Sequence, residues 1–283
     1  MIFISGDHPR HKYLARTLTE AGLLDGWIVE RRKPFMPSPP SGLADDLTRL
    51  FKLHFERRET AEHRFFGVPE APRNIDVMEV GPDTLNDAAT SRFIRARKPR
   101  LVLSYGCHKL SNELIAASGA VFWNTHGGLS PHYRGVTTHF WPSYMLEPAM
   151  TGMTMHETTS HIDGGAIIHQ SAVTLDPSDG LHDLAARAVK IYADEVPLLL
   201  GAALETELPA GAPQKTTGKI WLGSDWRPEH LRLIYDVYED RISAAALRGD
   251  ITGRSPSCIR LLDSQSTDGT MTTSSSTEGE TSA

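Results

Sequence analysis

Two apolar patterns alternate along the first half of the chain. Short apolar runs, typical of buried strands, occupy residues 1–5, 26–30, 74–80, 101–105 and 121–126. Between these runs, apolar residues recur every three or four positions, as they do on one face of a helix. The predicted helices span residues 12–21, 45–66, 84–97 and 111–118, the last capped by Ser111. This alternation predicts an α/β fold with an open, mostly parallel sheet and helices on both faces.

The second half of the chain is less regular. Residues 179–205 carry apolar positions at helical spacing and predict one long amphipathic helix that packs on the sheet. A linker rich in Pro, Gly and Thr follows over 209–219, then a short strand over 219–222 and a further helix over 228–248. We therefore expect a main domain over 1–208, a small carboxy-terminal appendage over 209–262 and a disordered tail over 263–283, where Ser, Thr, Gly and Glu dominate.

Composition narrows the class of protein. A chain of 283 residues with 40% hydrophobic content is long enough for one large α/β domain plus an appendage. Its longest apolar run, 196–204, is too short to span a bilayer, and the first apolar run is a predicted strand rather than a signal peptide. Two cysteines suggest a reducing, cytoplasmic environment, and a net charge of −6 argues against a nucleic-acid surface.

The candidate chemistry lies in three short segments. Asn124-Thr125-His126 ends the strand at 121–126, a turn over 129–135 follows, and Asp163-Gly164-Gly165 comes some thirty residues later. An amide can donate to a carbonyl oxygen that becomes an oxyanion, and an imidazole beside it can stabilise or shuttle charge. A carboxylate orients and charges that imidazole. We therefore predict Asn124, His126 and Asp163 as catalytic residues.

Taken in order, these segments resemble the catalytic half of the 10-formyltetrahydrofolate-dependent formyltransferases. Similar segments occur in methionyl-tRNA, glycinamide ribonucleotide and sugar N-formyltransferases: an Asn-x-His, a Leu-Leu-Pro-x-aromatic-Arg/Lys-Gly turn and a Gly-x-Thr…Asp-x-Gly segment. The residues that match are Asn124, His126, Pro131, Tyr133, Arg134, Gly135, Gly152, Thr154, Asp163 and Gly164. Ser130 departs from the usual second Leu of the turn. The resemblance implies a Rossmann-like formyltransferase catalytic domain over 1–208.

The resemblance also implies a folate pocket. A pterin ring needs a narrow slot lined by backbone amides and carbonyls. In the relatives this slot lies between the loop before the Asn-x-His strand and the loop before the Asp. The corresponding residues are Tyr105, Gly106, Cys107, His108, Lys109 and Leu110, with Thr159, Ser160, His161, Ile162 and Asp163. A Gly-x-Gly-x-x-Gly fingerprint is absent, so we predict no nicotinamide site.

Two other functions are compatible with some of these residues. A 10-formyltetrahydrofolate hydrolase resembles these enzymes over the same residues, but it normally carries an amino-terminal regulatory domain, which this chain is expected to lack. A non-catalytic folate-binding protein would have little reason to keep an amide, an imidazole and a carboxylate together. A metal site is not expected, because no Cys, Asp or Glu stands at ligand spacing from His132, His139, His156 or His161. His156 is interpreted as a strand residue.

The acceptor is expected to be the amine of a small metabolite, such as an amino sugar nucleotide or an amino-acid-derived amine. The segment after the linker is too short and too acidic to form a tRNA-binding barrel. The predicted acceptor-side residues are Arg10, Lys12, Tyr133 and Arg134.

A Pro-rich insertion over 34–66 adds Arg57, Arg58 and Arg64 to this basic cluster. Interleaved Glu56, Glu59 and Glu62 would make the same helix an ordinary charged surface, with pairs at i, i+3 and i+4, so two interpretations stay open. In the more specific interpretation, Arg10 and Lys12 bind a phosphate of the acceptor.

Aromatic residues are dense in the segment 216–250, which is not expected to do chemistry. Its aromatic residues are Trp221, Trp226, Tyr235 and Tyr238. Aromatic residues in so short a segment complete a core or anchor an interface. The core explanation is favoured for Ile234, Tyr238 and Ile242. The remaining surface makes a homodimer a further prediction.

Overall fold

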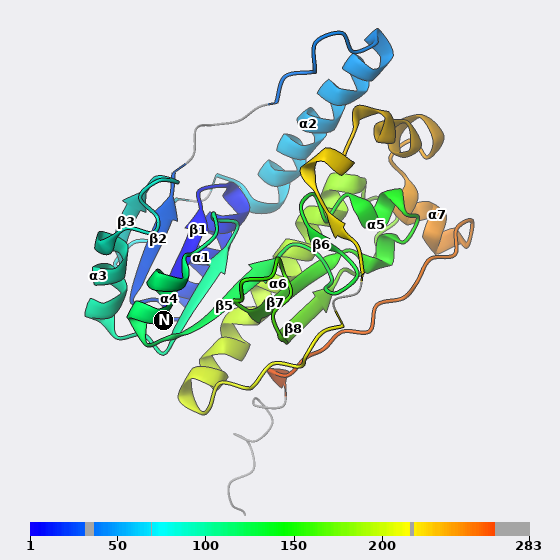
Figure 1. Cartoon of the computed structure of the whole chain (residues 1–283). Coiled ribbons are helices and arrows are strands. Elements are labelled where there is room, and N and C mark those ends of the chain that lie inside the picture. The colour runs from blue at the N-terminus through cyan, green and yellow to red at the C-terminus, as the bar shows by residue number, and fades with distance from the viewer. Residues whose placement is uncertain (32–36, 69, 216–217, 264–283) are drawn as a thin grey trace, which may run out of the picture.

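A seven-stranded sheet forms the centre of the molecule in the computed structural model, which describes residues 1–31, 37–68, 70–215 and 218–263 (Figure 1). The strand order is β3-β2-β1-β4-β5-β7-β8. The strands are β1 (Ile2–Gly6), β2 (Gly26–Glu30), β3 (Asp76–Val80), β4 (Leu101–Tyr105), β5 (Val121–His126), β7 (Gly152–Glu157) and β8 (Ile167–Ala172). The first five are parallel, and β7 and β8 are antiparallel to their neighbours. The predicted α/β fold with a mostly parallel sheet is confirmed.

The path of the chain through the sheet positions the site. From β1 the chain moves outward to β2 and β3, and then returns to the other side of β1 for β4 and β5. Strands β1 and β4 therefore meet where the winding direction reverses. In open α/β sheets, ligands bind outside the carboxyl ends of the strands at such a reversal.

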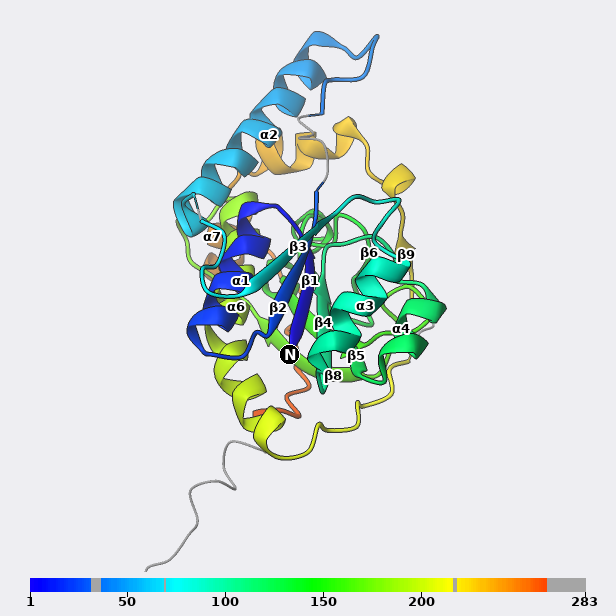
Figure 2. The same ribbon diagram turned by 90° about the vertical axis from the view of Figure 1, so that its left-hand side faces the viewer.

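Helices cover both faces of the sheet, as predicted (Figures 1 and 2). Helices α1 (Pro9–Glu20) and α6 (Leu181–Glu205) cover one face over a core that includes Trp27, Trp123 and Tyr192. Helices α3 (Ala88–Arg97) and α4 (Asn112–Ser118) cover the other. The Ser111 side chain accepts a hydrogen bond from the Leu114 N–H, so the predicted N-cap of α4 is present.

A second core lies beyond the carboxyl ends of the strands, between the insertion and the appendage. Helix α2 (Asp45–Phe66) packs there on α6 and α1, and the appendage lies along its other side (Figures 1 and 2). Smaller elements complete this region: β6 (Arg134–Gly135), α5 (Trp141–Tyr144), η1 (Pro148–Met150), β9 (Ile220–Trp221), η2 (Gly223–Asp225), η3 (Pro228–His230), η4 (Leu233–Val237) and α7 (Ile242–Arg248). Trp221 stacks on Trp141 with ring centroids 4.1 Å apart.

The aromatic residues of the appendage therefore complete a core. Trp226 packs among Phe51, Phe55 and Phe140. Ile234 and Ile242 are buried, and Tyr238 packs against the same cluster. This agrees with the core explanation for the appendage, whereas the homodimer stays a prediction.

The prediction of one helix over 228–248 was wrong. The segment contains a 3-10 turn, a π-helical turn and the short helix α7. The break falls at Glu239 and Asp240, whose φ values are +51° and +61°. Asp240 Oδ1 accepts the Leu181 N–H at 2.8 Å, so the interruption supplies a carboxylate to the first turn of α6. Apolar spacing alone did not reveal this tertiary contact.

Several boundaries differ from the predictions, and one strand was not predicted. Helix α1 begins at Pro9 rather than residue 12, and β8 was absent from the expected elements. None of the helices in the ranges described above combines the length and apolarity needed to cross a membrane. The predicted tail, apart from residue 263, and part of the Pro-rich loop lie outside the described residues.

Candidate active site

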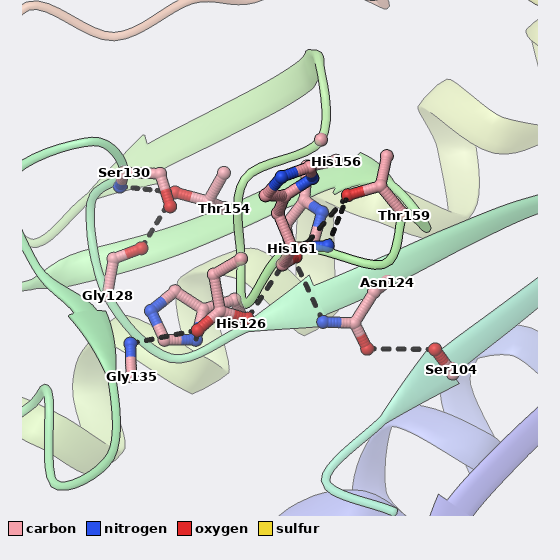
Figure 3. Close-up of polar contacts among 12 residues, drawn as sticks. Ser104, Asn124, His126, Gly128, Ser130, Gly135, Thr154, His156, Thr159 and His161 are labelled. Carbon is pink, nitrogen blue, oxygen red and sulfur yellow. Dashed lines mark hydrogen bonds and ion pairs between the residues drawn. The ribbon is translucent and has the colours of Figure 1, made fainter. Parts of the chain in front are cut away.

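Asn124 presents its amide group beside the end of β5. Neighbouring strand β4 carries Ser104, whose hydroxyl donates to Asn124 Oδ1 at 2.8 Å (Figure 3). Because the carbonyl oxygen is held by Ser104, the amide nitrogen faces the other way, toward β7. There Asn124 Nδ2 donates to His156 Nε2 at 3.2 Å. The Nδ2 group has two hydrogens, so one remains for a ligand oxygen.

His126 lies two residues further along β5, with its ring buried. Its Nε2 donates to the Tyr133 carbonyl at 2.8 Å, which places a hydrogen on Nε2. Its Nδ1 faces Asp163 Oδ2 at 3.4 Å. The Tyr133 carbonyl is positioned by a tight turn, in which the Tyr133 N–H donates to the Leu129 carbonyl. The turn after β5 therefore fixes the orientation of the imidazole.

Asp163 bridges two imidazoles. Its Oδ2 lies near His126, and its Oδ1 lies 3.5 Å from His156 Nε2. The Gly135 N–H donates to Oδ2 at 2.9 Å. Burial raises the pKa of the Asp163 carboxyl, but the two imidazoles and the Gly135 N–H outweigh it and bring the pKa to about 2. Asp163 is therefore a carboxylate at neutral pH.

The same carboxylate does not make His126 basic. Burial lowers the pKa of His126, and this exceeds the opposite effects of Asp163 and the Tyr133 carbonyl. Charge pairing with Asp163 thus acts in the predicted direction, but burial of the enclosed ring outweighs it. At neutral pH the imidazole is neutral and has a free Nδ1 lone pair on the Asp163 side.

His156 is a member of this cluster that the sequence interpretation missed. Its Nδ1 donates to the Glu157 carbonyl at 2.8 Å, which leaves Nε2 to accept from Asn124 (Figure 3). The antiparallel pairing of β5 with β7 places Asn124 directly opposite His156. The histidine at the end of an alternating strand was the available signal, but its meaning depended on a register that the sequence does not specify.

The turn residues support this cluster rather than project from it. The Tyr133 ring is buried in the second core, and its hydroxyl donates to Glu147 at 2.7 Å. The Arg134 side chain is also buried, and a β-carbon at Gly164 would lie 3.6 Å from its Nη1. Tyr133 therefore contacts the cluster through its carbonyl, and Arg134 packs beneath the loop that carries Asp163.

Comparison with known proteins places this geometry in a family. The family model described as formyl transferase matches residues 55–197, about half of the chain. The chain belongs to the formyl transferase family. Members of this folate-dependent family use 10-formyltetrahydrofolate as the formyl donor. The predicted family, enzyme class and cofactor are therefore confirmed.

Solved formyltransferases share the fold. Phosphoribosylglycinamide formyltransferase from Anaplasma phagocytophilum is similar with a TM-score of 0.51 at 16% identity, over 78% of this chain and 97% of that one. A sugar N-formyltransferase from Shewanella sp. FDAARGOS_354 is similar with a TM-score of 0.50 at 18% identity, over 79% of this chain and 77% of that one. At these identities the likeness concerns the fold of the formyl transferase and leaves its acceptor open.

In this formyl transferase, the loop after β4 has the properties expected of one wall of a folate slot. Gly106 turns the chain with φ +60°, and His108 and Lys109 are exposed. Glu30, buried at the end of β2, accepts the His108 N–H at 3.1 Å and so fixes the backbone of the loop. Tyr105 and Leu110 are buried and anchor its two ends, while Cys107 packs on the core beneath.

The second wall of the predicted slot precedes Asp163. Thr159, Ser160, His161 and Ile162 are all exposed, and the Thr159 hydroxyl donates to the His161 carbonyl at 3.3 Å. Since β5 lies between β4 and β7, the two loops approach Asn124 from opposite sides. The Thr158 hydroxyl is buried and makes no hydrogen bond within the described part of the chain. Four exposed residues and an unpaired hydroxyl are compatible with the hydrogen-bonding edge of a pterin.

In the first βα loop, Arg10 is not the free positive charge that was predicted for the acceptor side. The Arg10 guanidinium is largely buried, is ion-paired with Glu62 of α2 and lies 3.5 Å from His139 Nδ1. Glu62 also lies 3.3 Å from His8. Lys12 is half-buried and forms no ion pair within the described residues. The charge of Arg10 is thus already balanced by the protein.

The arginines of the insertion likewise find partners on other elements. Arg57 forms an ion pair with Asp240 at 2.5 Å, and Arg64 forms one with Asp183 at 2.8 Å. The prediction that Arg57 and Arg64 pair with glutamates of the same helix was therefore wrong. Both arginines instead join α2 to the appendage and to α6.

Proposed function

We propose that this protein transfers the formyl group of 10-formyltetrahydrofolate to the amine of a small metabolite, with Asn124, His126 and Asp163 as its catalytic residues. One observation supports this most strongly. A single carboxylate, Asp163, faces two imidazoles beside an amide with a free N–H, and these groups come from β5, β7 and the loop after β7. An amide donor, an imidazole and a carboxylate are suited to the charge and proton movements of formyl transfer.

The Asn124 amide is suited to stabilise the oxyanion. When an unprotonated amine attacks the formyl carbon, negative charge develops on the formyl oxygen. The second N–H of Asn124 is available for that oxygen, and Ser104 prevents the amide from turning its carbonyl oxygen there instead. His126 does not offer a second donor, because its Nε2 hydrogen is bonded to the Tyr133 carbonyl. We therefore propose that Asn124 is the main donor.

The imidazoles and Asp163 are suited to move a proton. Attack leaves an extra proton on the acceptor nitrogen, and departure of tetrahydrofolate needs one at N10. A proton held at His126 Nδ1 or His156 Nε2 would face an oxygen of Asp163, whose negative charge stabilises it. The new C–N bond forms, the bond to N10 breaks, and one proton passes from the acceptor nitrogen to N10. No proton is gained or lost overall.

Release of tetrahydrofolate with and without an amine tests this proposal. Asn124→Ala, His126→Ala and Asp163→Ala are each expected to lower turnover about 10²–10³-fold, since each removes a group that stabilises the transition state. Near-normal turnover in all three variants would contradict the assignment. Release that does not depend on any amine in a broad panel would instead indicate the hydrolase.

The wider setting follows from the sequence. We propose that the enzyme acts in the cytoplasm on an amino sugar nucleotide or an amino-acid-derived amine, as a homodimer with no nucleic-acid partner. The small appendage and the net charge of −6 support a metabolite over a tRNA as acceptor. Sedimentation at micromolar concentration checks the dimer, and a uniform monomer would remove it.

A further inference from the structure

Arg58 is exposed at the centre of the face that α2 otherwise buries. The buried positions of this helix are Leu47, Leu50, Phe51, His54, Ala61, Glu62 and Phe66. At about 100° per residue these positions cover one side of the helix, and Arg58 lies near the middle of it. Arg58 comes one turn after His54 and one turn before Glu62, yet its side chain is open to solvent. The buried face of α2 is therefore open to solvent at this position, and this opening is called the hollow below.

Polar contacts close the hollow at both ends along α2. On one side His54 Nδ1 lies 3.0 Å from the Tyr235 hydroxyl and 3.1 Å from His182 Nε2 of α6. On the other side Glu62 holds Arg10. The charge of Arg58 lowers the pKa values of His54 and His182, so its guanidinium lies near the rings at the first border.

The guanidinium also lies near the second border. Arg10, Glu62 and the Tyr105 ring at the end of β4 all influence the pKa of Arg58. Desolvation is the largest influence and lowers this pKa, although the side chain is exposed. The Arg58 guanidinium is therefore open to water and yet close enough to the surrounding protein for desolvation to lower its pKa.

Arg58 supplies the unbalanced positive charge of this hollow. Glu62 neutralises Arg10, and no carboxylate of the described residues comes within ion-pair distance of Arg58. The surrounding histidines add no charge at neutral pH. Burial is the main cause that lowers the pKa of His54 to about 3, and that of His182 is also lowered. A partly desolvated arginine without a counter-ion is suited to bind an anion.

Side-chain contacts link the hollow to the catalytic cluster. Arg10 Nη1 lies 3.5 Å from His139 Nδ1, and the His139 ring packs against Gly127, the residue after His126. Tyr105, which influences Arg58, ends β4 beside β5. A ligand in the hollow would therefore lie beside the catalytic strand, on the side of the first βα loop.

We propose that Arg58 binds an anionic group of the acceptor, a phosphate or a carboxylate, while the amine of the same molecule reaches Asn124 and Asp163. This inference rests on the proposed formyl transfer and assigns the anion contact to Arg58 instead of Arg10. A guanidinium can pair with either anion through two parallel hydrogen bonds. The acceptor is thus an anionic amine, and α2 of the insertion selects it.

Anion binding without turnover is the first test. Inorganic phosphate, pyrophosphate and acetate are titrated by calorimetry into the wild type, Arg58→Gln and Arg49→Gln. Arg49→Gln is the matched control, since it removes one exposed arginine from the same helix. Loss of a charged hydrogen-bond partner should weaken the tightest anion about tenfold or more in Arg58→Gln and leave it unchanged in the control. Equal affinity in all three proteins, or no anion binding by the wild type, overturns the proposal.

Kinetics with a matched pair of amines form the second test. Glucosamine 6-phosphate and glucosamine differ only in the phosphate, and glucosaminic acid tests a carboxylate. Arg58→Gln should raise KM for the preferred anionic amine about tenfold, without changing KM for 10-formyltetrahydrofolate or the slow rate with glucosamine. Arg58→Lys should recover part of the loss. An equal rise for charged and uncharged amines would refute a contact with the anion.

A third variant separates this proposal from the proposed function. Asn124→Ala should lower transfer about 10²–10³-fold while it binds anions as tightly as the wild type. Suppose that the wild type binds anions but transfers no formyl group, and that Arg58→Gln binds anions more weakly. The anion site then stands, and the proposed formyl transfer is wrong. If transfer is normal and Arg58→Gln changes neither anion binding nor KM, only the anion site fails.

Discussion

The hydrogen bond from Ser104 to Asn124 allows a precise test of how the amide is oriented. The Ser104 hydroxyl is buried and donates to Asn124 Oδ1 at 2.8 Å. A buried hydrogen bond between neutral groups contributes about 1 kcal/mol, which corresponds to about a fivefold preference for the held orientation. Ser104→Ala should therefore lower kcat about two- to fivefold, because the amide spends more time with its oxygen toward the substrate.

Comparison with other variants makes this prediction decisive. Asn124→Ala removes the donor itself and should cost about 10²–10³-fold. In the double variant Ser104→Ala/Asn124→Ala, the serine has nothing left to orient, so its loss should add little to that of Asn124→Ala. Ser104→Thr keeps a hydroxyl and should retain most of the activity.

Single-turnover rates with saturating 10-formyltetrahydrofolate provide the measurement, and Ser118→Ala serves as a control. Ser118 also lies in the α/β domain, but its hydroxyl donates to the Ile115 carbonyl and accepts the Ala120 N–H, both at the end of α4. Unchanged turnover in Ser104→Ala, or losses that multiply in the double variant, would refute the orientation argument.

Three further predictions concern the folded state. Gly106→Ala should weaken 10-formyltetrahydrofolate binding and lower the melting temperature, because Gly106 has φ +60° and a β-carbon would lie 2.5 Å from an imidazole nitrogen. Gly119→Ala has a similar φ but open space around it, so its smaller loss measures backbone strain alone, and equal losses would contradict the clash. Unfolding by urea should become easier as pH falls from about 6.5 toward 3. Burial is the main cause that lowers the folded-state pKa of His54 to about 3. The unfolded chain therefore takes up the proton first, and protonation favours unfolding. His54→Phe should flatten this slope, and an unaltered slope would show that other groups cause it. Arg187→Met should lower the free energy of unfolding by about 3 kcal/mol, since it leaves the fully buried Asp179 carboxylate without its two-bond partner, and a loss below 1 kcal/mol would show that water replaces the arginine.

The parts of the site that could be predicted from sequence are those that local geometry determines. Asn124 and His126 are two residues apart on one strand, so both side chains point to the same face of the sheet. The strand itself was evident from its apolar run, and the order of the segments pointed to Asp163. These three residues do meet in the structure.

The parts that could not be predicted depend on contacts between distant segments. His156 reaches Asn124 only through the register of β5 with β7. Arg10 was expected to be available to a ligand, but its charge is balanced by Glu62, 52 residues away. The break at Asp240 is likewise explained by a contact with α6 and not by any local pattern. Sequence spacing contains little information about such pairings.

One contact described above bears on whether the appendage is a separable module. Gly135, whose N–H holds Asp163, belongs to β6, and β6 pairs with β9 of the appendage. A β-carbon at Gly135 would lie 2.1 Å from the Trp221 carbonyl, so the two backbones are in close contact. The Gln214 side chain of the linker also donates to the Asp163 carbonyl at 2.9 Å.

The appendage is therefore built into the support of the catalytic carboxylate. A chimera that joins this α/β domain to the appendage of another formyltransferase would need an equivalent of both β9 and Gln214 to preserve the position of Asp163. Insertions and deletions near the catalytic loop are consequently constrained by residues that lie outside the sheet and far along the chain. In evolutionary terms, the two parts of this enzyme have to change together.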